Sequence, residues 1–276
     1  MKLSIITIIV FVLSGMRVTP LEAQDQDQTW IKMDDGFEYG EFPASIKSIS
    51  GEDNISIVRI NPELYSFHLL TCDELGHSSL TAAEWTLKYQ MLGVFNAGMF
   101  LTDHKTNVGY MKNYSHINNP RISSQYHSVA AFNPVDSTTN SFMLFDTDDY
   151  DINEIIPEYN TVIQNLRLIK SPGKNRWSKQ EKRWSELALG QDTDGNILLI
   201  FSRSPYSMHE LNSMLIDLPI SIDRAQHLEG GTEASIYITH GGHQIEKIGS
   251  YESSFNENDD IKSFWPIPNV IGIRKR

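Results

Sequence analysis

The stretch 184-WSELALGQDTDGNILLIFSRS-204 decides the fold class of this sequence. Apolar runs lie on both sides of a polar segment, Asp192–Asn196, and its Asp194-Gly195 pair is a strong signal for a tight turn between antiparallel strands. We therefore predict a β-hairpin. The same polar segment could suggest a calcium loop, but Arg203 stands where an EF-hand requires glutamate, so a turn is the better interpretation.

Further strands are predicted on both sides of this hairpin, from alternating or short apolar runs bounded by turn residues. The segment 160–170 fits either a helix or a strand, and 264–273 is expected to form a closing edge strand. The remaining predicted strands occupy residues 55–60, 63–71, 92–100, 127–134, 141–147, 224–228 and 234–239.

Two helices are predicted, and both begin with a capping box. Thr81 is followed three residues later by Glu84, and Ser207 by Glu210. Each hydroxyl can accept a hydrogen bond from the backbone N–H of the glutamate, and the glutamate side chain can accept one from the backbone N–H of the capping residue. The strands come in runs, without strict alternation with helices. The sequence therefore predicts an α+β fold, with a mixed, largely antiparallel sheet packed with a few helices in a single domain. The predicted helices span residues 79–91 and 207–219.

The first residues predict export. A lysine and a short apolar core lead to a small residue at Ala23, as in a secretory signal peptide covering residues 1–23. The apolar core is shorter than the roughly 20 residues that span a membrane, although an uncleaved anchor is the alternative. We expect a secreted or periplasmic protein with no membrane span after cleavage. Residues 24–50 would be an N-terminal extension, flexible up to Asp35, before a domain at 51–276.

The composition limits the kinds of molecule that this protein is expected to bind. The formal net charge of −12 disfavours nucleic-acid binding, although a local basic pocket could still take a small anionic substrate. The only cysteine, Cys72, cannot form an internal disulfide, and no paired base stands near it, so a packed thiol is expected.

A second stretch, 227-HLEGGTEASIYI-238, carries the candidate chemistry. If the strands on either side of it are neighbours, Gly230 and Gly231 lie at their shared end, where positive φ and close approach of a ligand to the backbone are possible. The amides there could form an anion-binding nest, bordered by Glu229 and Glu233. The alternative is an exposed hairpin with two solvated glutamates.

The stretch 96-NAGMF-100 is the other candidate. Asn96 ends an apolar strand, and the small pair Ala97-Gly98 follows, which suits either a ligand contact or an Asx turn. The histidines are scattered without the HExxH spacing, so no metal site and no cofactor are predicted.

Three blocks in order carry a family resemblance: 95-FNAGMF-100, 188-ALGQDTDGNILLIFSRSPYSMHELNSML-215 and 224-RAQHLEGGTEAS-235. Together they resemble the uncovering-enzyme-like phosphodiester glycosidase family over residues 54–239, which makes 51–276 the expected glycosidase-like domain. Glu229 replaces the family's usual aspartate, TEAS replaces a short serine-rich run, and Arg183 is displaced from the family's basic position. These departures indicate a bacterial secreted subgroup.

The resemblance implies a hydrolase that cleaves a sugar-1-phosphodiester of the N-acetylglucosamine type, in an exopolysaccharide or cell-wall glycan, with a carbohydrate or sugar phosphate as partner. Glu229 would direct water or stabilise the oxocarbenium-like centre, with Glu233 as its partner or as an acceptor for a sugar hydroxyl. Because LEGG replaces LDGG, a non-catalytic carbohydrate-binding protein on the same scaffold is the alternative function.

The substrate would be held by backbone and side-chain donors. Arg203 is the expected phosphate clamp, because a guanidinium fork matches two phosphate oxygens. The other predicted substrate-binding residues are Asn96, Gly98, His127, Gly230 and Gly231, with Arg121 as a weaker candidate.

Overall fold

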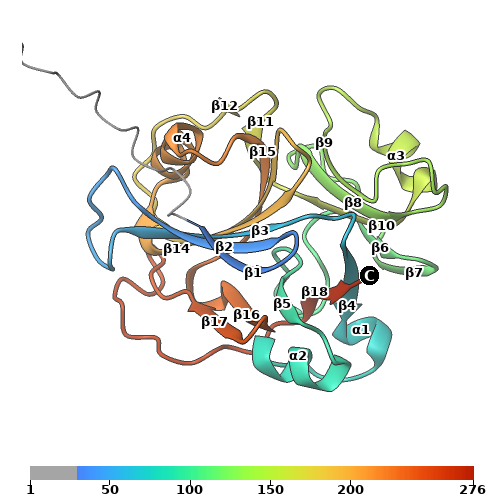
Figure 1. The fold of residues 1–276 in the computed structure, drawn as a ribbon, viewed down its shortest axis with the longest axis horizontal. Helices are drawn as coiled ribbons and strands as arrows, with labels where there is room; N and C mark the ends of the chain where they lie inside the picture. Colours follow the sequence, from blue (N-terminus) through green and yellow to red (C-terminus); the bar gives the residue numbers. More distant parts are fainter. Residues whose placement is uncertain (1–29) are drawn as a thin grey trace, which may run out of the picture.

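The computed structural model describes residues 30–276, in which 18 strands form three sheets (Figure 1). Every strand pair in this part of the chain is antiparallel. The predicted α+β class with largely antiparallel pairing is confirmed. The predicted signal peptide lies outside the described residues.

The first sheet has eight strands and contains both the hairpin that opened the sequence analysis and the strand that leads to Glu229. In spatial order its strands are β1 (Trp30–Asp34), β2 (Phe37–Pro43), β3 (Asn54–Ile60), β14 (Ile197–Tyr206), β13 (Trp184–Asp192), β15 (Ile222–Gly230), β11 (Arg167–Lys170) and β12 (Lys174–Asn175).

The other two sheets have five strands each. The second runs β7 (His116–Asn119), β6 (Met111–Asn113), β10 (Tyr159–Asn165), β8 (Ser128–Pro134) and β9 (Phe142–Asp146). The third runs β17 (His243–Ile248), β16 (Ser235–His240), β5 (Gly93–Asn96), β18 (Asn269–Lys275) and β4 (Tyr65–Thr71).

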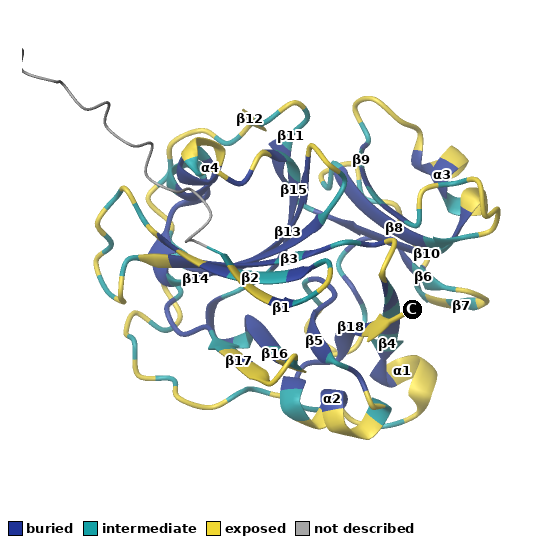
Figure 2. Cartoon of the chain, viewed as in Figure 1, coloured by how far each residue is buried: buried dark blue, intermediate teal, exposed yellow. Residues whose placement is uncertain are grey.

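One apolar core joins the three sheets, because residues such as Leu199, Phe132 and Phe95, one from each sheet, belong to the same buried cluster. Each sheet also packs against one helix through a smaller cluster. Those helices lie around the outside, with exposed outer sides (Figure 2). They are α4 (Met208–Asp217) on the first sheet, α3 (Ile152–Glu158) on the second and α2 (Ala82–Tyr89) on the third; α1 (Cys72–Leu75) is a single turn.

Local sequence signals predicted these elements well. The β13–β14 hairpin is confirmed, and so is the pairing of β8 with β9. Both capping boxes are present, at Thr81 for α2 and Ser207 for α4. The ambiguous segment forms strands β10 and β11, and Cys72 is a free, buried thiol as expected. Among residues 30–276, none of the helices has the length and apolar character needed to cross a membrane.

Two expectations about the ends of the domain are wrong. The segment up to Asp35 is not flexible from Trp30 onward, because β1 pairs with β2 and the Trp30 ring packs against Phe42 at 5.2 Å between centroids. Since β2 in turn pairs along its length with β3, the predicted boundary at residue 51 falls inside a sheet. The closing strand β18 is not an edge strand but lies between β5 and β4, which suits its continuous buried run from Asn269 to Ile273.

The condition set for the glycine pair, that the strands on either side of it are neighbours, is not met. Strand β15 belongs to the first sheet and β16 to the third, and the short 3-10 helix η2 (Gly231–Glu233) joins them. The pair is therefore a crossing between two sheets and not a hairpin turn. This difference positions the candidate site.

Candidate active site

At both glycines of the crossing, a neighbouring side chain lies where a Cβ atom would be. A Cβ atom at Gly230 would lie 2.6 Å from Cδ1 of Trp184. A Cβ atom at Gly231 would lie 2.5 Å from Oε2 of Glu252, and its φ of +65° is one that glycine adopts most readily. The predicted positive φ is therefore found at Gly231. The space beside it is filled by a carboxyl group, however, and not left open for an external anion.

Glu229 carries the most unusual carboxyl group of the crossing. Its side chain is half-buried and accepts one hydrogen bond, from the N–H of Gly230 to Oε1 at 3.1 Å. Burial raises the pKa of Glu229 to about 8, against the opposing effects of His227 and of the Gly230 amide. A carboxyl group with a pKa raised this far can hold its proton near neutral pH and act as a hydrogen-bond donor.

Beside Glu229, a buried pair joins β15 to the neighbouring strand β13, with His227 on β15 and Glu186 on β13. Nδ1 of His227 lies 2.7 Å from Oε1 of Glu186, and the indole N–H of Trp184 donates to Oε2 of Glu186 at 2.6 Å. Burial lowers the pKa of His227, but the acids around it, Glu186 first, outweigh burial and raise it.

Sequence reasoning missed Glu186, although a signal was available. It is a lone charged residue within the apolar run of β13, and a charge in such a strand is rarely buried without a partner. Its position opposite Gly230 in the register of β13 and β15 could not be read from the local sequence.

The second predicted catalytic residue, Glu233, lies at the other end of the crossing. Its carboxylate accepts a hydrogen bond from the hydroxyl of Thr232 at 2.7 Å. Its charge is among the effects that raise the pKa of Glu229, so the two predicted acids interact electrostatically.

Asn96 lies at the crossing, where its side chain binds the backbone of the crossing. Its Nδ2 donates to the carbonyl of Glu233 at 3.1 Å, and its Oδ1 accepts from the N–H of Ser235 at 2.8 Å. With 1% of its surface exposed, Asn96 ties the end of β5 to the crossing.

Gly98 is buried where two amides converge. A Cβ atom there would lie 2.8 Å from Oδ1 of Asn107 and 2.9 Å from Nδ2 of Asn165. Both of these atoms are buried and have no hydrogen-bond partner among residues 30–276.

Arg203 lies in different surroundings. Its guanidinium contacts Asp259 and the carbonyls of Ile248 and Ile261, and it lines a cavity of about 560 Å³ together with Lys247 and other residues outside the crossing. None of its contacts within the described chain is with Glu229 or Glu233. The structure thus does not bring this predicted phosphate clamp to the predicted acids.

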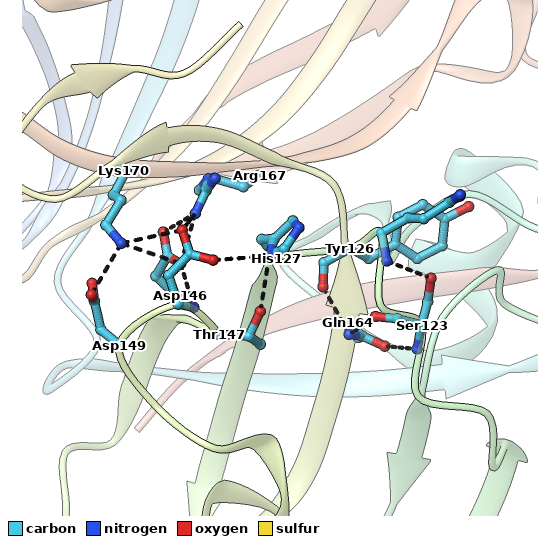
Figure 3. A network of polar contacts seen from close by, with 11 residues as sticks. Ser123, Tyr126, His127, Asp146, Thr147, Asp149, Gln164, Arg167 and Lys170 are labelled. Atoms are coloured by element: carbon cyan, nitrogen blue, oxygen red, sulfur yellow. Dashed lines mark hydrogen bonds and ion pairs between the residues drawn. The ribbon is translucent and has the colours of Figure 1, made fainter.

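His127 belongs to an ion network at the edge of the second sheet (Figure 3). Its Nδ1 lies 3.2 Å from Asp148, whose carboxylate also binds Arg167 at 2.6 Å and Lys170 at 3.3 Å. Every group in this network is paired with another protein group. Arg121, the weaker candidate, donates its backbone N–H to Asn119.

The residues that converge therefore define an acidic junction between two sheets: Trp184, Glu186, His227, Glu229, Gly230, Gly231, Glu233 and Glu252, with Asn96 behind it. We call this set the glycine corner. Among residues 30–276, no group of three or more His, Cys, Asp or Glu side chains is placed to hold a metal ion.

Comparison with solved structures gives the class of fold. The chain is similar to the catalytic domain of zebrafish N-acetylglucosamine-1-phosphodiester alpha-N-acetylglucosaminidase auto-inhibited by its pro-peptide, with a TM-score of 0.60 and 16% identity over 87% of this chain and 84% of that one. It is also similar to a hypothetical protein from Synechocystis, with a TM-score of 0.60 and 14% identity over 90% of this chain and 63% of that one. At these identities the likeness concerns the fold alone.

The family follows from the sequence itself. The model of the phosphodiester glycosidase family matches residues 89–274, and the chain therefore belongs to that family. The resemblance noted from the three sequence blocks is confirmed at this level. No match was found among curated proteins.

Proposed function

We propose that this protein is an exported hydrolase that cleaves the bond between the anomeric carbon of a sugar and a phosphodiester oxygen. Membership of the phosphodiester glycosidase family supports the reaction class. The observation that carries the proposal is the presence of two acids, Glu229 and Glu233, at the two ends of the short crossing, where burial raises the pKa of Glu229 to about 8. The substrate class would be an N-acetylglucosamine-1-phosphodiester of an exopolysaccharide or cell-wall glycan, handled by a bacterial subgroup with LEGG in place of LDGG.

The protonation of Glu229 changes its expected role. A phosphodiester is an anion, and two ionised glutamates at the crossing would repel it, whereas a neutral carboxyl group can donate a hydrogen bond to a phosphate oxygen. Glu229 would then act as the proton donor to the departing phosphate oxygen. The carboxylate of Glu233 would direct water or stabilise the oxocarbenium-like centre.

The surrounding residues would position these two acids. The His227–Glu186 pair is buried beside Glu229 and fixes the end of β15, while Asn96 holds the backbone of Glu233. The substrate-binding roles predicted for Arg203 and His127 receive no support from their contacts, so we do not place either residue in this reaction.

The test is hydrolysis of the methyl diester of N-acetylglucosamine 1-phosphate, with free sugar and methyl phosphate measured by NMR. We expect release of both products. Binding of the diester without release would instead identify a non-catalytic carbohydrate-binding protein. If the protein neither binds nor cleaves the diester, the proposed substrate class is contradicted.

A further inference from the structure

The segment between β17 and β18 crosses from the third sheet to the first before it returns. The N–H groups of Ser250 and Tyr251 donate to the hydroxyl of Ser185 at 3.0 and 3.1 Å, and the N–H of Ser253 donates to the carbonyl of Arg183 at 2.9 Å. Residues 249–261, which we call the clasped loop, therefore run beside the start of β13, next to the glycine corner.

One arginine fastens both ends of this loop. Arg203 donates from Nη1 to the carbonyl of Ile248 at 2.5 Å and from Nη2 to the carbonyl of Ile261 at 2.8 Å, while Nε lies 2.6 Å from a carboxylate oxygen of Asp259. Arg203 itself is part of β14, a central strand of the first sheet. A planar guanidinium can satisfy several acceptors at once, which a lysine ammonium in the same place would not reproduce.

The clasped loop places a fourth acid, Glu252, at the glycine corner. The Oε2 atom of Glu252 occupies the space beside Gly231, and its backbone bridges to Trp184. Within residues 30–276 its carboxyl group accepts no hydrogen bond and makes no ion pair. Because this side chain is only partly buried, its carboxyl oxygens are accessible and can accept a hydrogen bond from a donor outside the protein.

We propose that Glu252 is a substrate-contacting residue that accepts a hydrogen bond from a sugar hydroxyl, and that Arg203 is the positioning residue that holds it there through the clasped loop. This inference rests on the proposed function for the identity of the ligand. A sugar hydroxyl suits the position, because a neutral hydroxyl can donate a hydrogen bond to a carboxyl oxygen of Glu252. Glu252 would therefore contribute to sugar selection and Glu229 to the chemical step.

The first experiment separates binding from chemistry with the methyl diester of N-acetylglucosamine 1-phosphate. Glu252→Ala should raise KM about tenfold, the size expected for a lost hydrogen bond to a charged group, and leave kcat within about threefold. In a Glu229→Gln background the same substitution should raise Kd, measured by calorimetric titration, by a similar factor. Glu257→Ala is the matched control, since Glu257 is an exposed glutamate of the same loop that accepts only from the N–H of Ser254.

The second experiment tests the role of Arg203. Arg203→Met should speed hydrogen exchange across residues 249–261 and raise KM as Glu252→Ala does, and the double variant should be no worse than either single one. Arg203→Lys should not restore the KM. Faster exchange with an unchanged KM would overturn the positioning role.

Two outcomes distinguish this inference from the proposed function. If the wild type cleaves the diester and Glu252→Ala leaves both KM and Kd unchanged, the role of Glu252 is overturned while the proposed function stands. If the wild type neither binds nor cleaves the diester, both fail together.

Discussion

Glu229 illustrates how neighbours decide the chemistry of one residue. The sequence identified it as a candidate acid from its place before two glycines. Its pKa could not be predicted, because the pKa depends mainly on burial, and in addition to the nearby His227 and Glu233 it depends on Glu186 from another strand. The same holds for Arg203, whose residue type suits a phosphate, whereas its guanidinium is occupied by the backbone of a loop more than forty residues away.

The role of Glu229 predicts a large catalytic effect from a small change. Glu229→Gln should lower kcat at least about 100-fold, because the amide cannot transfer a proton, while the protein stays folded by circular dichroism. Glu154→Gln, at an exposed position on α3, is the matched control and should retain full turnover. Normal turnover in Glu229→Gln would remove this residue from the mechanism.

The contact of Gly231 with Glu252 predicts a measurable loss of stability. Gly231→Ala should lower the free energy of unfolding by about 1–3 kcal/mol more than Gly195→Ala does, because only the former places a methyl group against a neighbour. Gly195 is a suitable control, since its φ of +87° is also positive and a Cβ atom there would meet nothing within 4 Å. Equal losses in urea unfolding would show that backbone conformation alone requires glycine at 231.

At the level of elements, the sequence predicts local features correctly but not long-range strand pairings. Capping boxes and the Asp-Gly turn act within a few residues, so α2, α4 and the β13–β14 hairpin were predictable. Assigning β15 and β16 to different sheets required knowledge of their partners, and those partners, β13 and β5, lie about 40 and 140 residues away in the chain. The same reason explains why β18 was expected at an edge.

The crossing from β15 to β16 depends on Asn96. Asn96→Ala should lower the free energy of unfolding by about 1–3 kcal/mol, because the carbonyl of Glu233 and the N–H of Ser235 would lose their buried partner. Asn140→Ala, at an exposed asparagine, should change stability little. The measurement is urea unfolding followed by fluorescence, and a loss no larger than that of the control would contradict a supporting role.

The whole molecule places an acidic junction at the meeting point of two sheets that share one core. This arrangement explains why several carboxyl groups are buried there and why their protonation is linked to folding. The three sequence blocks that carry the family resemblance contain Asn96 and the 227–233 part of the junction, whereas Trp184, Glu186 and Glu252 lie outside these blocks and were not predicted.

This linkage predicts how stability changes with pH. The folded-state pKa of Glu229, about 8, lies above the ordinary value of about 4.3 for an unfolded chain, so between these values only the folded state holds the proton. The contribution of Glu229 to stability is therefore fully present below about pH 4.3 and is lost as the pH rises to about 8. Unfolding free energies should show the wild type losing stability relative to Glu229→Gln between pH 5 and pH 8, and a constant difference would contradict the raised pKa.

The pH dependence of kcat/KM for the methyl diester of N-acetylglucosamine 1-phosphate tests the central claim most directly. If a protonated Glu229 donates to the departing phosphate, kcat/KM should be level near neutral pH and fall about tenfold per unit above about pH 8. A rate that instead rises through pH 8, or that falls only below about pH 5 with the loss of an ionised Glu229, would contradict the account.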